Sequence, residues 1–202
     1  MKRAAIGVRM HSGWGALVAV SNNDGIVEIL VRRRVVVTIA DARGGNQPYH
    51  FAKTLELSEA EKFLLDSSAA SRRLALAAVR DLIGELSGQY IVVGAAVLLA
   101  SGRALPPLAK ILAAHPLIHA AEGEFFREAI SKACESLDLP VTGIRERNLD
   151  EYVQSAFGEA STGMQQLVST LGHSLGPPWT TDQKMAALAA LVVLANKPAD
   201  SR

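Results

Sequence analysis

The stretch IGVRMHSGWGALVAV (Ile6–Val20) decides the fold prediction. An apolar segment leads into a short turn with two glycines, and a second apolar segment leaves it. This pattern predicts antiparallel strands over residues 4–8 and 16–21. The sequence NNDG that follows favours a tight turn, because Asn, Asp and Gly tolerate positive φ. The β-branched run after it predicts a third strand with a bulge near residues 32–34, so the chain opens with a three-stranded antiparallel meander.

The middle of the chain alternates helical and strand patterns. Ser58 and Glu61 form a capping-box signature, which predicts a long helix that ends at Ser87. The almost wholly apolar run over residues 89–102 predicts a central strand covered on both faces. The remaining patterns predict a short helix after Pro106 and Pro107, a helix over 123–137, a strand over 139–144 and a helix over 149–157.

The carboxyl-terminal part of the chain has a different pattern. We expect residues 1–157 to form an α/β domain and residues 158–202 to form a helical extension packed on it. Thr180 and Gln183 form a second capping box before a last helix over residues 182–196. This helix is apolar enough to need a partner surface, which is either the domain itself or the same helix in a homodimer.

Composition excludes several classes of protein. The 202 residues carry a net charge of +1, so no global field steers the chain toward nucleic acid or an acidic membrane. The single cysteine, Cys134, excludes an intramolecular disulfide and is expected in the core. Every apolar run is well below the roughly 20 residues that span a bilayer. We therefore expect a soluble, cytoplasmic protein with no membrane partner.

The order of elements, a meander followed by α/β units, resembles the ribonuclease H-like superfamily. The resemblance covers residues 4–157 in topology and the first hairpin in sequence. It implies a two-metal nuclease site with one acid on the first strand and another near the fourth. This chain has Arg9 and His11 at the first place and no acid over residues 91–100. The resemblance thus implies the fold without its usual metal-binding carboxylates.

A more distant resemblance is to the middle domain of archaeal and eukaryotic class 1 release factors. In that domain a Gly-Gly-Gln loop follows the third strand of a meander and precedes a long helix. Gly44, Gly45, Asn46 and Gln47 stand at the comparable place here. The inserted asparagine breaks the motif and would displace the glutamine. The resemblance implies a ribosome-associated role.

Several polar residues form a candidate ligand-binding set. The connection over residues 41–57 holds Arg43, Gln47 and Tyr49, and two glycines there allow close backbone approach to a ligand. Arg145 follows the predicted last strand, where α/β sheets collect ligands. Arg9, with two of the arginines at positions 32–34 and nearby Trp14, could hold an anion or single-stranded nucleic acid. Each of these sets has an alternative interpretation. The connection over residues 41–57 could be only a solvated loop, Arg145 could form a surface ion pair, and the arginines at 32–34 could mark a charged edge strand.

The stretch HPLIHAAEGEFF (His115–Phe126) is a candidate metal site. His115 and His119 are four residues apart, and Glu122 lies three further on. If the helix is unbroken, Glu122 lies in its apolar face and must be paired or functional, because an unpaired buried charge is costly. If the helix begins at Gly123, Glu122 is its cap and the metal geometry weakens. The set lacks a sure third ligand for zinc, so the sequence predicts no cofactor and leaves a divalent metal open.

Two functions of different class follow. The first is a noncatalytic binding or assembly module, indicated by the missing acids on the first and fourth strands. The second is a hydrolase, metal-dependent or not, acting on a phosphoester or nucleic acid. Its site would be drawn from titratable residues near strand ends and loops, namely His11, Asp41, His50, His119 and Glu122.

Overall fold

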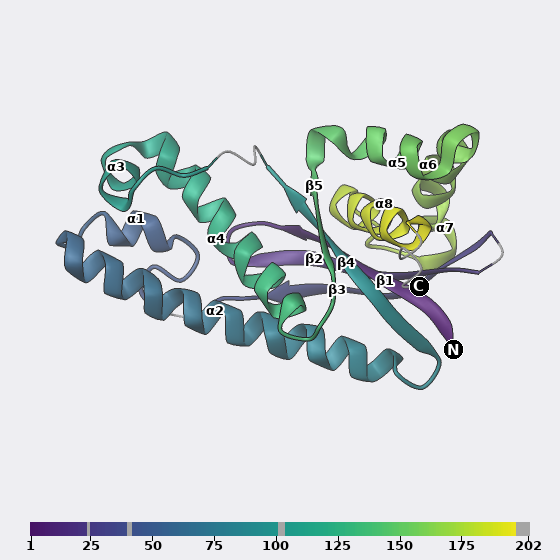
Figure 1. The fold of residues 1–202 in the computed structure, drawn as a ribbon, viewed down its shortest axis with the longest axis horizontal. Helices are drawn as coiled ribbons and strands as arrows, with labels where there is room; N and C mark the ends of the chain where they lie inside the picture. The colour runs from purple at the N-terminus through teal and green to yellow at the C-terminus, as the bar shows by residue number, and fades with distance from the viewer. Residues whose placement is uncertain (24, 40–41, 101–103, 197–202) are drawn as a thin grey trace, which may run out of the picture.

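The computed structural model describes residues 1–23, 25–39, 42–100 and 104–196. Within these ranges a five-stranded sheet, in the order β3-β2-β1-β4-β5, has helices on both faces (Figure 1). None of the helices in the described part of the chain has the length and apolar character that a membrane crossing requires.

The sheet confirms the predicted meander. Strand β1 (Lys2–Met10) pairs antiparallel with β2 (Trp14–Asn23), and β2 with β3 (Ile26–Val36). Strands β4 (Tyr90–Leu99) and β5 (Val141–Arg145) run parallel to β1. The β2–β3 register shifts between Ala19 and Val20, which leaves Leu30 without a partner; the bulge therefore lies just before the predicted position.

One face of the sheet is covered by two long helices, α2 (Leu57–Leu86) and α4 (His115–Glu135). Cys134 lies in this core, as predicted, and burial raises the pKa of its thiol to about 12. Beyond the sheet, α1 (Pro48–Ala52) and α3 (Leu108–Ala113) pack with the first turns of α2 and α4 around two small apolar clusters. Figure 1 shows this helical lobe at the left.

Two helix starts differ from the predictions. Helix α2 begins at Leu57 with Glu56 as its N-cap residue and no side-chain cap bond, so the predicted capping box of Ser58 and Glu61 is wrong. Helix α4 begins at His115, because Pro116 fits its first turn and Gly123 is tolerated in its interior. The alternative in which a helix begins at Gly123 is therefore wrong.

The other face is covered by α5 (Leu149–Phe157), α6 (Ser161–Thr170), α7 (Gly172–Leu175) and α8 (Thr181–Ala195). Short 3-10 turns, Glu146–Asn148 and Gly158–Ala160, precede α5 and α6. The capping box of Thr180 and Gln183 is present at α8, as predicted. Helix α8 buries its apolar residues against the sheet of the same chain. A division of the chain at residue 157 stays a prediction.

Helix α8 lies unusually close to the central strand. A Cβ atom at Gly7 of β1 would lie 1.8 Å from the carbonyl oxygen of Ala186. Only a residue without a side chain allows this approach. The contact fixes the start of α8 beside the carboxyl end of β1.

Candidate metal centre

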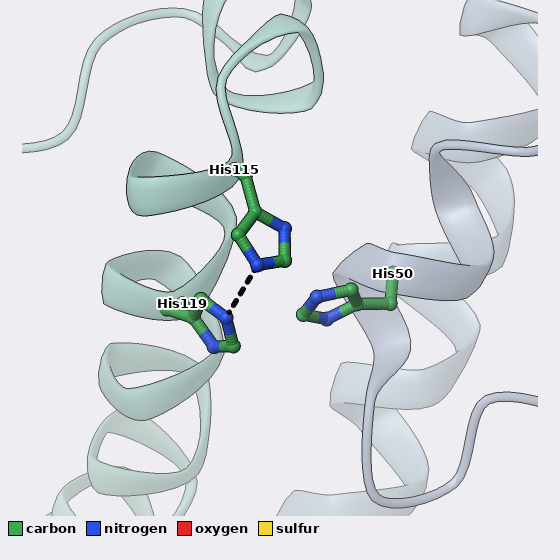
Figure 2. A group of neighbouring side chains, drawn as sticks. All are labelled: His50, His115 and His119. Carbon is green, nitrogen blue, oxygen red and sulfur yellow. Dashed lines mark hydrogen bonds between the residues drawn. The ribbon is translucent and has the colours of Figure 1, made fainter.

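Three histidines meet in the helical lobe. His50 comes from α1, and His115 and His119 come from the first two turns of α4. We call these residues the histidine cluster. One ring nitrogen from each lies within 4.8 Å of the others. Figure 2 shows the three rings gathered between the two helices. The sequence identified His50 and the histidine pair separately, and the packing of α1 against α4 brings them together.

One spacing in the cluster, between the two histidines of α4, is close to that of metal ligands. The Nε2 atoms of His115 and His119 are 3.0 Å apart. Nitrogen ligands at the Zn–N distance of ~2.0–2.1 Å lie roughly 3.3 Å from one another in a tetrahedral site. The unbroken helix supplies this pair because residues i and i+4 share a face. His115 and His119 are exposed, so solvent and a substrate can reach the cluster.

Glu122 orients His50 from inside the protein. Its carboxylate is buried, with 3% of the residue exposed. It accepts hydrogen bonds from the backbone N–H of His50 at 3.1 Å and from Nδ1 of His50 at 2.9 Å. A proton on Nδ1 leaves the lone pair of Nε2 available as a ligand, and carboxylate–histidine pairs of this kind support metal sites. Glu122 is therefore neither a helix cap nor an unpaired buried charge.

The second group of charged residues lies where β1 and β5 end and α8 begins. Arg9 donates from Nε and Nη2 to both carboxylate oxygens of Glu146, at 3.2 and 2.8 Å, and from Nη1 to Asp182. His11 Nε2 lies 2.9 Å from the other oxygen of Asp182. We call Arg9, His11, Glu146 and Asp182 the strand-end cluster. The hydrogen bond and charge of Glu146 raise the pKa of Arg9 further above its usual value, against the effect of burial.

Comparison with solved structures shows which fold this chain is similar to. RuvC from Thermus thermophilus matches with a TM-score of 0.54 and 13% identity over 95% of this chain and 93% of that chain. T. thermophilus RuvC in complex with Holliday junction substrate matches with a TM-score of 0.53 and 13% identity over 96% and 93%. The fold is ribonuclease H-like.

Other comparisons add little to this result. A Ppx/GppA family member from Aquifex aeolicus has a TM-score of 0.37 and 12% identity over 77% of this chain and 40% of that chain. No protein-family model matches, and no curated protein matches in sequence.

In this ribonuclease H-like fold, the strand-end cluster does not suit a two-metal site. Glu146 and Asp182 supply carboxylates that the sequence analysis missed, but one guanidinium pairs with both of them. A cation already occupies the position between the carboxylates, and the remaining residue, His11, pairs with Asp182. Hard divalent ions need free oxygen ligands, which this arrangement does not offer.

Two sequence signals for these carboxylates were available. Glu146 immediately follows β5, and Asp182 lies in the first turn of α8. The residue predicted at this end of β5 was Arg145, which is exposed. Ends of separate elements could be recognised as neighbours only once the position of α8 against β1 was known.

The predicted ligand-binding residues separate in the structure. Arg43 and Gln47 are exposed, whereas Tyr49 packs edge-on against Phe125 with 6.1 Å between ring centroids. Burial is the main cause that raises the pKa of Tyr49. Asp41 lies outside the described residues.

The predicted basic patch around Arg9 does not form. Arg9 is paired with acids, Arg32 donates to the carbonyl oxygens of Leu175 and Gly176, and Arg33 pairs with Glu85. Arg34 alone of the three lies over Trp14, 4.0 Å from the ring centroid. His11 stacks on the same indole with 4.4 Å between centroids, so an aromatic and cationic surface borders the strand-end cluster.

Proposed function

We propose that the protein is a metal-dependent hydrolase whose metal is held by the histidine cluster. The observation that carries the proposal is the convergence of three imidazoles from two helices, with a buried carboxylate orienting one of them. Three protein ligands leave a fourth position for water, which is the arrangement of catalytic rather than structural zinc sites. A bound Zn²⁺ lowers the pKa of a coordinated water to about 7 and so supplies the nucleophile for hydrolysis.

The fold and the access to the site support a substrate class. RuvC, which shares the ribonuclease H-like fold, has been seen with a Holliday junction substrate. The cluster is open to solvent through His115 and His119, so a large substrate can approach it. A phosphoester, including one in nucleic acid, is the substrate that these features support.

Metal binding tests the proposal directly. Untagged protein titrated with Zn²⁺ in a calorimeter is expected to bind one ion per chain. His119→Ala removes a ligand and is expected to weaken binding by about 100-fold or more, and Glu122→Gln by about 10- to 100-fold, the usual effect of losing an orienting partner. His173→Ala, an exposed histidine on α7, is the matched control and should bind like the wild type.

The same variants connect metal to activity. Hydrolysis of bis(p-nitrophenyl) phosphate should require the added metal and disappear in His119→Ala while remaining in His173→Ala. Wild-type protein that binds no Zn²⁺, or His119→Ala protein that binds it as tightly as wild type, would contradict the metal centre. A metal-loaded protein without hydrolysis of any phosphoester would leave the metal centre and reject the hydrolase.

The strand-end cluster favours a second candidate, a noncatalytic binding module. Arg9 neutralises both carboxylates there, and Trp14 with Arg34 borders them. Aromatic and cationic side chains together bind nucleic acid through stacking and charge. Arg34→Gln is expected to weaken binding of a fluorescently labelled four-way DNA junction several-fold in anisotropy titrations, whereas exposed Arg145→Gln is not. Equal affinities of the wild type, Arg34→Gln and Arg145→Gln for the junction would reject this surface as a binding site.

A further inference from the structure

A small cavity adjoins the histidine cluster along α4. It has a volume of about 160 Å³, and its wall includes His119, Glu124 and Arg127 together with the small residues Ala120 and Gly123. His119 therefore belongs both to the histidine cluster and to the cavity.

The absence of a side chain at Gly123 leaves room for the side chain of Arg127. A Cβ atom at Gly123 would lie 2.7 Å from Nη1 of Arg127. Long side chains on a helix point back toward its amino terminus, so a residue four positions later covers the earlier one. The guanidinium thus lies over the turn that separates it from His119, and glycine at 123 leaves the space for it.

Arg127 is anchored by one nitrogen and presents the other two. Its Nε donates to the backbone oxygen of Leu98 near the end of β4, at 3.1 Å. Within the described residues, neither Nη1 nor Nη2 has a hydrogen-bond partner. Burial is the main cause that lowers the pKa of Arg127; the charges of Glu124 and Glu146 oppose this effect, and the charge of Arg9 adds to it. A fixed, half-buried guanidinium with unused donors suits a planar, bidentate contact with a phosphate or carboxylate.

Glu124 completes the cavity wall with an acceptor. A carboxylate beside an anion site is unfavourable unless it takes part in the reaction or is separated from the anion. In hydrolysis, the water oxygen bonds to phosphorus as the bond from phosphorus to the ester oxygen breaks. One water proton would pass to Glu124, and the leaving alkoxide would take a proton from solvent. Glu124 is the described carboxylate on this cavity that can accept the proton.

We infer that the cavity between His119 and Arg127 is the site for the phosphoryl group of a phosphoester substrate, with Arg127 binding its oxygens. The inference rests on the proposed hydrolase function and adds to it the place where the phosphoryl group of the substrate binds. It places the recognised anion in the cavity that His119 and Arg127 line on α4.

Binding of inorganic phosphate tests the inference without a known substrate. Calorimetric titrations compare wild type, Arg127→Gln, Gly123→Ala and Arg80→Gln, each with and without Zn²⁺. Arg127→Gln is expected to weaken phosphate binding about tenfold or more, the effect of one lost charge-assisted contact. Gly123→Ala is expected to weaken it less, because its Cβ displaces the guanidinium of Arg127 without removing the charge. Arg80→Gln, an exposed arginine on α2, should bind like wild type. Alanine is a better helix former than glycine, so Gly123→Ala should remain folded.

The outcomes separate the two proposals. Zn²⁺ binding with equal phosphate affinity in wild type and Arg127→Gln would overturn the phosphoryl site and leave the metal centre. Wild type that binds no phosphate in either form would also overturn it. Phosphate binding that depends on Arg127 and Gly123 in a protein that binds no Zn²⁺ would support the phosphoryl site and reject the hydrolase.

Discussion

Gly7→Val is expected to unfold the protein or to expel α8 from the sheet. The added Cβ would lie 1.8 Å from the carbonyl oxygen of Ala186 and 2.6 Å from its carbonyl carbon. Both atoms belong to the backbone of α8, and β1 is held between β2 and β4, so neither side can move by rotating a side chain. Overpacking usually costs about 1–3 kcal/mol. Because the obstacle here is backbone, we expect a loss of at least about 4 kcal/mol.

Urea denaturation followed by circular dichroism measures the effect. Gly84→Ala is the matched control, because no atom lies within 4 Å of a Cβ built at this helical position. It should raise the free energy of unfolding by up to about 1 kcal/mol through helix propensity alone. A Gly7→Val protein with wild-type stability would show that α8 does not lie on β1 as described.

Arg9→Met is expected to destabilise the protein by about 2–3 kcal/mol, and millimolar Mg²⁺ is expected to restore part of the loss. The substitution removes the shared partner of Glu146 and Asp182, which are 27% and 20% exposed at the side chain. Breaking a buried ion pair costs about 3–5 kcal/mol, and the partial exposure of this pair reduces that figure. Two freed carboxylates at one place then become ligands for a hard cation.

The denaturation midpoint with and without Mg²⁺ measures both effects. Arg145→Met changes the neighbouring exposed arginine and should alter neither value. A Mg²⁺ response in wild type equal to that of Arg9→Met would contradict the view that Arg9 closes this site to metal.

The fold was largely predictable from local sequence, and the candidate site was not. The hairpin around SGWG and the apolar run of β4 carry local patterns of apolar residues and turn residues that tertiary packing does not override. The meander and the central strand were therefore predicted correctly. Glu122 could be recognised as a charge in an apolar face that needs a partner. Its partner, His50, lies in a connection without periodicity, and α1 is only five residues long.

The strand-end cluster was missed for a related reason. Its members come from β1, the turn after β5 and the first turn of α8, so only the tertiary fold makes them neighbours. The absence of acids on the first and fourth strands was read correctly. Arg9 was predicted to bind a ligand, but in the structure its charge is paired with Glu146 and Asp182 of the same chain.

The position of His50 on a five-residue helix has a consequence for folding. A metal held by the histidine cluster would join α1 to α4 much as a covalent cross-link does, since it closes the long loop of chain between them. The helical lobe would then gain stability as the free metal concentration rises above the dissociation constant. Metal availability would thus set how firmly one end of the molecule is folded.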